Sequence, residues 1–84
     1  MSSATTTTIY TTGTCAYCHA EKEFLKNHDV AFTEVPVDTD DAAAEKMIAL
    51  SGQMSVPFTV VTKGSEEERI IGFDPARLTT ALGL

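Results

Sequence analysis

The chain has 84 residues and a mass of 9.0 kDa, and 43% of its residues are hydrophobic, which is enough for one small packed core. Its twelve acidic and six basic residues give a net charge of −6. Nucleic acid and anionic lipid surfaces bind basic patches, so this balance argues against both as main partners. We therefore expect a single domain over residues 1–84. Nothing in the sequence indicates an oligomer, so we expect a monomer.

The N-terminus is small and polar, and it lacks the positive charge and apolar run of a secretory signal. No stretch approaches the roughly 18 consecutive apolar residues that a membrane helix needs. We therefore expect residues 1–5 to form a disordered tail. We also expect the protein to be cytoplasmic, with no membrane partner, unless a signal has already been removed.

In chain order, the first predicted elements are a strand and a helix. Thr7–Thr11 is rich in β-branched and aromatic residues and predicts a strand that ends at Gly13. The segment from Ala16 to about His28 has helical periodicity. The helix face expected to be buried carries Ala20, Phe24, Leu25 and His28. The face expected to meet water carries Glu21, Lys22, Glu23 and Lys26.

A second strand and a second helix follow. Val30–Val37 alternates apolar and polar residues and predicts a strand, which Pro36 weakens at its end. The acidic loop Asp38–Asp41 is suited to cap a helix, because it places negative charge at the helix N-terminus. That helix is predicted from about Ala42 to Leu50, and Ser51-Gly52 ends it.

The last part of the chain predicts a hairpin and a third helix. Phe58–Lys63 and Arg69–Ile71 are separated by too few residues for a crossover helix, so they predict two antiparallel strands. Asp74 as N-cap and Pro75 at the first helical position predict a helix that runs to about Leu82. The order is β–α–β followed by β–β–α, so the fold class is α/β and the first two strands are expected to be parallel.

The only two cysteines form the motif Cys15-Ala16-Tyr17-Cys18, between the predicted first strand and the predicted first helix. Cys15 is therefore expected at the helix N-terminus, where unpaired backbone N–H groups and the positive end of the helix dipole favour a thiolate. Cys18 comes one turn later and is expected to point inward, within reach of the first sulfur. An exposed nucleophile beside a shielded thiol is the arrangement that thiol–disulfide exchange requires.

Other functions of the cysteine pair stay open at this point. With His19, the motif matches the C-x-x-C-H string of c-type haem attachment, although that chemistry belongs to exported proteins. Zinc needs four ligands and a second ligand pair is missing, because His19 and His28 lie nine residues apart; no metal is expected. A structural disulfide would gain little by closing so short a loop. Two inert buried cysteines are the plainest remaining alternative.

A second marker is Ser55-Val56-Pro57, whose proline directly precedes an apolar strand. With both markers in place, the chain from Thr8 to Leu84 resembles the glutaredoxins, and most of all the short bacterial glutaredoxin-like proteins. The resemblance implies a minimal thioredoxin fold, in which a four-stranded mixed sheet is flanked by three helices. The motifs that carry it are Ile9-Tyr10-Thr11, Thr14-Cys15-Ala16-Tyr17-Cys18, Ser51-Gly52-Gln53-Met54-Ser55-Val56-Pro57 and Ile71-Gly72-Phe73-Asp74.

The resemblance also implies a role for each motif. Cys15 would attack a disulfide, and Cys18 or a second thiol would resolve the mixed disulfide. Val56–Pro57 would be a cis peptide facing the cysteines, with the Val56 backbone pairing to a bound thiol peptide. Glutathione is the implied co-substrate, and the residues implied to bind it or the substrate are Tyr17, Gln53, Val56, Pro57, Phe73 and Asp74. Structural roles compete with these: Asp74 also suits the N-cap of the last helix, and Tyr17 and Phe73 suit aromatic edges over the small core.

The implied activity is thiol–disulfide oxidoreduction of protein disulfides or glutathione mixed disulfides, with either glutathione or thioredoxin reductase as electron donor. Many glutathione-binding members have a lysine where this chain has Thr12, and the cations expected near a bound glutathione are Lys22 and Arg77. Gly72-Phe73 before Pro75 resembles the redoxins that serve ribonucleotide reductase and are reduced by thioredoxin reductase. Two other classes stay open: a glutathione-ligated 2Fe–2S cluster held between two subunits, and an adaptor whose cysteines are spectators.

Overall fold

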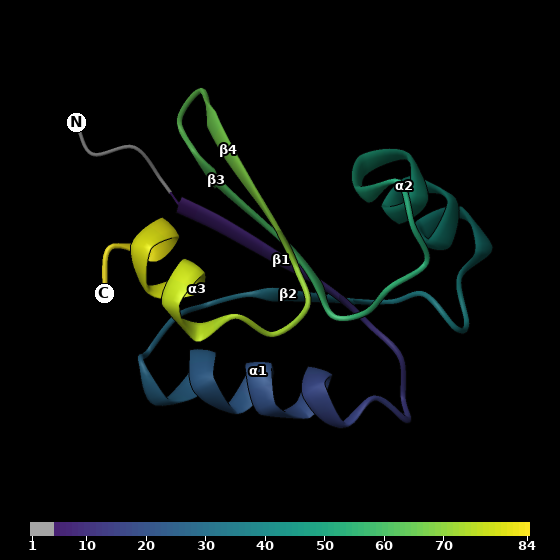
Figure 1. Cartoon of the computed structure of the whole chain (residues 1–84), viewed down its shortest axis with the longest axis horizontal. Helices are drawn as coiled ribbons and strands as arrows, with labels where there is room; N and C mark the ends of the chain where they lie inside the picture. Colours follow the sequence, from purple (N-terminus) through teal and green to yellow (C-terminus); the bar gives the residue numbers. More distant parts are fainter. Residues whose placement is uncertain (1–4) are drawn as a thin grey trace.

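The computed structural model describes residues 5–84, which form four strands and three helices (Figure 1). The strands are β1 (Thr5–Thr11), β2 (Thr33–Pro36), β3 (Phe58–Lys63) and β4 (Glu66–Ile71). The helices are α1 (Ala16–Asn27), α2 (Asp41–Ser51) and α3 (Pro75–Leu82). Within residues 5–84, no helix has the length and hydropathy needed to span a membrane.

The four strands form one mixed sheet in the order β2-β1-β3-β4. β1 runs parallel to β2 and antiparallel to β3, and β3 runs antiparallel to β4, as the sequence predicts. In the register, Tyr10 of β1 lies opposite Phe58 of β3, which lies opposite Ile71 of β4. The end of β1, the start of β3 and the end of β4 therefore meet at one edge of the sheet. The segments 12–15, 55–57 and 72–74 join these strand ends and are gathered at that edge.

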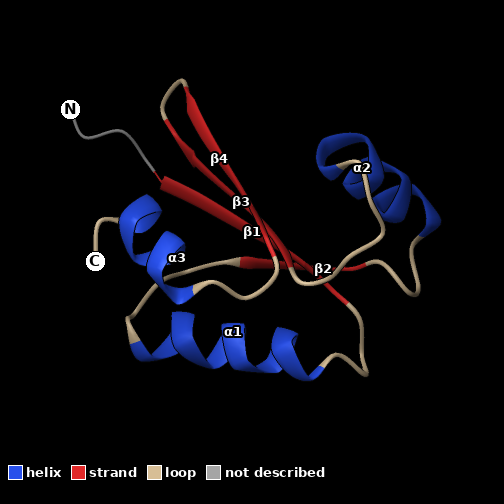
Figure 2. Cartoon of the chain, in the orientation of Figure 1, coloured by secondary structure: helices blue, strands red, loops and turns tan. Residues whose placement is uncertain are grey.

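Helices cover both faces of the sheet, with α2 on one face and α1 and α3 on the other (Figure 2). The buried residues between α2 and the sheet are Tyr10, Val37, Ala43, Met47 and Phe58. Those on the opposite face are Val61, Ile70, Leu78 and Ala81, with Phe24 and Phe73 packed against them. Because both faces are covered, the central strand β1 buries successive residues, Ile9 and Tyr10, instead of alternating ones.

Two of the predicted helix caps are present in the structure. The side chains of Asp40 and Asp74 accept backbone N–H groups from Ala43 and Arg77, at 3.1 Å and 3.2 Å, and so cap α2 and α3. Gly52 ends α2 with a φ of 78°, in the left-handed region that glycine adopts at little cost. These residues set the two helix starts and the α2 end close to where the sequence predicts them.

The first strand is longer than its composition suggests. β1 begins at Thr5, because Thr5 and Thr6 pair with Lys63 and Thr62 of the long hairpin strand β3. The expected disordered tail is therefore wrong at residue 5, and its residues 1–4 lie outside the described part of the chain.

The other two strand boundaries also differ from the prediction. β2 starts at Thr33 instead of Val30, because the Val30 N–H donates to the Leu25 carbonyl at 2.9 Å and helps to end α1. β4 starts three residues before Arg69, at Glu66, opposite Lys63. The hairpin turn is therefore shorter than predicted, and acidic residues assigned to it belong to a strand.

Candidate active site at the start of the first helix

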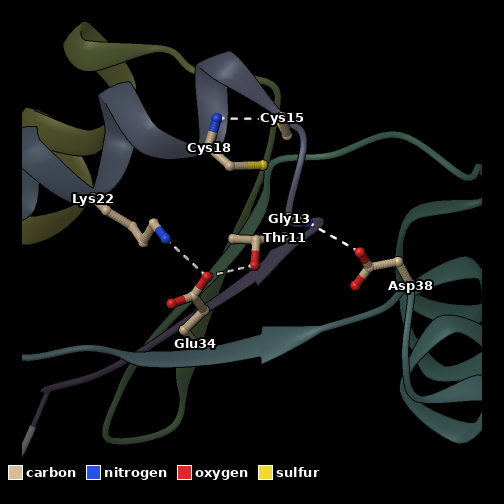
Figure 3. Close-up of polar contacts among 7 residues, drawn as sticks. All are labelled: Thr11, Gly13, Cys15, Cys18, Lys22, Glu34 and Asp38. Carbon is tan, nitrogen blue, oxygen red and sulfur yellow. Dashed lines mark hydrogen bonds and ion pairs between the residues drawn. The ribbon is translucent and has the colours of Figure 1, made fainter.

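Cys15 is the N-cap residue of α1. Its backbone is extended, with φ −86° and ψ 112°, and its Sγ accepts the backbone N–H of Cys18 at 3.1 Å (Figure 3). An N-cap side chain usually offers an oxygen to this donor, and here a sulfur takes that place. Because the N–H groups of the first turn and the positive end of the helix dipole point toward it, this sulfur is in a setting that favours negative charge. Cys15 is half-buried, so a substrate disulfide can reach it.

Cys18 lies on the inner face of α1, and its thiol is free. The residue is 1% exposed. Burial raises the pKa of Cys18 to about 12, and the neighbouring Cys15 side chain and its charge add to the rise. The Cys18 thiol therefore stays protonated at neutral pH. The structure thus pairs an accessible sulfur supported by a backbone amide with a shielded thiol one turn away.

The loop before Cys15 is hydrogen-bonded to the segment that leads into α2. The backbone N–H of Gly13 donates to Oδ2 of Asp38 at 3.0 Å, and Asp38 lies just before α2 (Figure 3). A second hydrogen bond, from the Cys15 N–H to the Thr12 carbonyl at 3.4 Å, closes the turn into the helix. The position of the start of α1 therefore depends on Asp38, a residue distant in the sequence, as well as on the turn itself.

A polar cluster joins α1 to the two parallel strands beside the cysteines. Oε2 of Glu34 on β2 accepts from Oγ1 of Thr11 at 2.7 Å and from Nζ of Lys22 at 3.0 Å (Figure 3). The hydrogen bond from Thr11, and then that from Lys22, lowers the pKa of Glu34. Thr11 is the last residue of β1, so the cluster orients the first half of α1 relative to the strand that leads to Cys15.

The Val56–Pro57 segment lies at the same edge of the sheet. Its peptide bond is cis, as the resemblance implies. The Pro57 carbonyl accepts the backbone N–H of Gly72 at 2.8 Å, which joins the segment before β3 to the segment after β4. Among the described residues, no backbone group hydrogen-bonds to the N–H or C=O of Val56. These two groups are therefore free to pair with an extended ligand.

Phe73 and Asp74 follow directly after this contact and have structural roles of their own. Phe73 is half-buried and packs edge-on against Phe24, with ring centroids 6.1 Å apart at 71°. Asp74 caps α3 through the Arg77 N–H. The structure places both residues at the same sheet edge as Pro57, and their part in ligand binding stays a prediction.

Tyr17 and Gln53 are the remaining predicted binding residues. Tyr17 is 69% exposed, so it does not cover the core. The Gln53 side chain accepts from Oγ of Ser55 at 3.4 Å, inside its own loop, and nothing in the described residues joins it to the cysteines. Sequence reasoning passed over its neighbour Met54, which is 66% exposed. Met54 is an apolar residue between α2 and β3, outside any predicted strand or helix, and that position is the sequence signal for its exposure.

The two cations expected near a bound glutathione are both paired with acidic side chains. Lys22 pairs with Glu34 at 3.0 Å, and Arg77 lies 3.7 Å from a carboxylate oxygen of Glu68. The Arg77 pair is exposed and weak, whereas the Lys22 pair belongs to the half-buried polar cluster. A glutathione carboxylate would have to displace an existing partner to use either cation.

The predicted faces of α1 are wrong at two positions. Glu21 is fully buried, although the charged face was expected to meet water, and His28 is exposed at the end of the helix. The reason is that Cys18, Glu21 and Leu25, at positions i, i+3 and i+7, form the buried stripe. That spacing is the sequence signal for the burial of Glu21, and it conflicts with the usual preference of a carboxylate for solvent.

The two histidines do not join the cysteines. His19 is exposed on α1, and the His28 ring packs against Phe24 at a tilt of 51°, with ring centroids 4.5 Å apart. Across residues 5–84, no three His, Cys, Asp or Glu side chains are grouped as a metal site requires.

Comparison with known proteins identifies this architecture. The sequence model of the Glutaredoxin family matches residues 7–65. Glutaredoxin 3 of Escherichia coli strain K12 is 47% identical over 49 residues, which cover 58% of this chain and 59% of that protein. This alignment thus spans less than two thirds of glutaredoxin 3.

Two longer matches are to glutaredoxin-like proteins called NrdH. The NrdH protein of Lactococcus lactis subsp. cremoris is 32% identical over 71 residues, covering 84% of this chain and 92% of that protein. The solved structure of the NrdH-redoxin from Escherichia coli has a TM-score of 0.71 and 32% identity, covering 88% of this chain and 91% of that chain. The four-stranded mixed sheet with three helices is accordingly a minimal thioredoxin fold, as predicted. The chain belongs to the glutaredoxin family.

Proposed function

We propose that the protein is a thiol–disulfide oxidoreductase that uses Cys15 as nucleophile and Cys18 as resolving thiol. The observation that carries this proposal is the hydrogen bond from the Cys18 N–H to the Cys15 sulfur at the start of α1. A sulfur that caps a helix N-terminus and accepts a backbone N–H is placed to act as the attacking nucleophile of thiol–disulfide exchange. Membership of the glutaredoxin family supports the same reaction class.

The reaction has two exchange steps. The Cys15 thiolate attacks one sulfur of a substrate disulfide, forms a mixed disulfide and releases the other substrate sulfur as a thiolate. Cys18 then attacks Sγ of Cys15, forms the Cys15–Cys18 disulfide and releases the second substrate thiol. The substrate gains two electrons, and an electron donor must reduce the Cys15–Cys18 disulfide before the next cycle.

The substrate segment is proposed to lie along Val56. The free backbone N–H and C=O of this residue offer an antiparallel pairing to an extended peptide next to the cysteines. The exposed side chains of Tyr17 and Met54 would flank such a segment. An accessible protein disulfide and a glutathione mixed disulfide can both offer an extended segment that carries the sulfur to be attacked.

The electron donor separates two versions of this function. Glutathione is the donor in the first version, and it would bind through Gln53, Phe73 and Asp74. Thioredoxin reductase is the donor in the second, which the paired states of Lys22 and Arg77 favour, because two glutathione carboxylates would then lack a free cation. The similarity to NrdH proteins supports the second version as well.

The test is to oxidise the full-length protein and supply NADPH with either of two donor systems, glutathione plus glutathione reductase or thioredoxin reductase alone. NADPH consumption in the presence of an excess disulfide substrate reports turnover. Turnover with either system supports the oxidoreductase, and the system that works names the donor. Absence of turnover with both, for a protein whose Cys15–Cys18 disulfide demonstrably forms and is reduced by dithiothreitol, would overturn the proposal.

A further inference from the structure

Glu21 is a buried carboxyl group with an incomplete set of partners. The residue is 0% exposed, and one oxygen, Oε2, accepts the hydroxyl of Thr59 on β3. The other oxygen, Oε1, is buried and has no hydrogen-bond partner among the described residues. A buried carboxyl group is costly to keep charged and costly to leave unpaired. A buried carboxyl group with an unpaired oxygen in so small a core points to a use beyond packing.

The surroundings of Glu21 keep it partly protonated. The residues paired with Thr59 in the sheet are Ile9 of β1 and Ile70 of β4, and both are fully buried. These apolar neighbours remove water from the carboxyl group, and this burial raises the pKa of Glu21 to about 7. The hydrogen bond from Thr59 opposes the rise without cancelling it.

Cys18 is the titratable neighbour of Glu21 on the buried face of α1. It lies one helical turn earlier on the same buried stripe of α1, at a spacing that places two helical side chains next to each other. Burial and Cys15 are the larger causes of the raised pKa of Cys18, and the charge of Glu21 adds a smaller contribution. The charged groups on the nearby elements, Lys22 of α1 and Glu34 of β2, are paired with each other. β1, β3 and β4 present uncharged residues, Ile9, Thr59 and Ile70.

We propose that Glu21 is the internal proton acceptor for Cys18 in the resolving step, and its proton donor when the disulfide is reduced again. The inference rests on the proposed dithiol function and deepens it. Cys18 is sealed from solvent, so bulk water and buffer cannot take its proton directly. The unpaired oxygen of Glu21 is the buried acceptor that the same helix face supplies.

The proton and the electron pair each have a destination in the resolving step. In the mixed disulfide, the Cys15 sulfur carries no charge, so the part of the rise in Cys18 pKa that comes from a Cys15 charge is absent. As Sγ of Cys18 attacks Sγ of Cys15, the Cys18 proton passes to Oε1 of Glu21, and the bond between Cys15 and the substrate sulfur breaks. Cys18 and Cys15 become a disulfide, the substrate leaves as a thiolate, and Glu21 becomes neutral. Reduction of the disulfide returns the proton to Cys18.

The two exchange steps can be timed separately with Ellman's reagent, an aromatic disulfide that releases one coloured thiolate at each step. The first release reports attack by Cys15 and tests the proposed function. The second release reports attack by Cys18 and tests Glu21. In the wild-type protein, the rate of the second release is expected to rise with pH and to level off above about pH 7, as Glu21 ionises.

The variant Glu21→Gln keeps the size of the side chain and an oxygen that can accept from Thr59, but it cannot take a proton. We expect an unchanged first release and a second release at least about tenfold slower at pH 7, because a positioned base contributes that much or more. The levelling near pH 7 should disappear, and the rate should keep rising with pH. Glu23→Gln, which removes an equal charge from the exposed face of α1, is the matched control and should behave as wild type.

The outcomes separate the two proposals. A missing first release in the folded wild-type protein removes the dithiol function itself. A normal first release with a second release that is equally fast in Glu21→Gln and wild type overturns only the role of Glu21. The wild-type pH profile tests that role without any variant: a second-release rate that rises without levelling between about pH 6 and about pH 9 also overturns it.

Discussion

The backbone N–H of Cys18 donates a 3.1 Å hydrogen bond to Sγ of Cys15, so the buried cysteine supports the accessible one through its main chain. The same residue keeps its own thiol protonated, because burial raises the pKa of Cys18 to about 12. A single helical turn thus gives the two cysteines different surroundings: Cys15 is accessible and accepts a backbone N–H, whereas Cys18 is buried. The dependence on main-chain geometry means that changing the Cys18 side chain should leave Cys15 reactive.

The first prediction follows from this division of roles. Cys15→Ser should abolish reduction of all disulfides, because the attacking sulfur is gone. Cys18→Ser should keep the first attack, and therefore the reduction of glutathione mixed disulfides when glutathione resolves them, while it blocks dithiol reduction of protein disulfides. The two variants should be compared in both assays, and equal losses in both would contradict the assigned roles.

The second prediction separates two functions of Asp74. Asp74→Ala should lower the free energy of unfolding by about 1 kcal/mol, because α3 loses its N-cap. Asp74→Asn keeps a capping oxygen but removes the charge, so it should retain most of that stability. If glutathione is the donor and Asp74 binds it, Asp74→Asn should still raise the KM for glutathione several-fold. Urea denaturation and glutathione titrations measure the two effects, and an unchanged KM in Asp74→Asn removes Asp74 from the binding residues.

Much of this fold could be read from local sequence. The β-branched run before Cys15, the Asp40 and Asp74 caps, and the short hairpin turn each act through neighbouring residues, and the structure confirms the elements they predict. The predictions that were wrong depend on distant partners. Thr5 belongs to β1 because β3 is long enough to pair with it, and Glu21 is buried because Thr59, far along the chain, meets it.

The candidate site divides in the same way. The position of Cys15 at a helix start follows from adjacent residues, so the motif was enough to predict it. The pairing of Gly13 with Asp38, and of Pro57 with Gly72, arises only when strand ends meet at one edge of the sheet. The ion pairs of Lys22 and Arg77 likewise involve glutamates on strands distant in the sequence, Glu34 of β2 and Glu68 of β4. The sequence alone therefore did not show that these cations are already paired.

The third prediction concerns stability and pH. An exposed glutamate titrates near 4.5, whereas burial raises the pKa of Glu21 to about 7. Between these values the unfolded chain releases the proton while the folded protein keeps it, so folding stability falls as pH rises through this window. Above about pH 7 the loss of folding stability caused by the charged, buried Glu21 is complete and is on the order of 3 kcal/mol. Glu21→Gln should therefore gain stability relative to wild type between about pH 5 and about pH 8.

Urea denaturation of both proteins at several pH values measures this difference directly. Glu34, whose pKa is lowered, acts in the opposite direction: its stabilisation is present above its unfolded pKa and is lost as pH falls. Because Glu34 is common to both proteins, its contribution cancels in the comparison. Parallel pH dependences for wild type and Glu21→Gln would contradict a raised pKa at Glu21.

The fourth prediction concerns the loop before the cysteines. Asp38→Ala removes the acceptor of the Gly13 N–H and should slow the attack of Cys15 on Ellman's reagent a few-fold, because the start of α1 loses an anchor. The free energy of unfolding should fall by about 1 kcal/mol. Asp38→Asn retains a side-chain oxygen and should preserve both quantities. If Asp38→Asn slows the reaction as much as Asp38→Ala, the charge near the loop matters and the hydrogen bond does not, and if neither variant is slowed, the anchor has no part in the reactivity of Cys15.

The most direct test of the proposed site is the relative reactivity of its two thiols. The reduced protein is treated at neutral pH with a limiting amount of iodoacetamide, and peptide mass spectrometry locates the modified cysteine. Cys15 should be alkylated first, and Cys18 should react at a comparable rate only after unfolding in urea. Alkylation of both at similar rates in the folded protein, or of Cys18 before Cys15, would contradict a supported nucleophile beside a shielded resolving thiol.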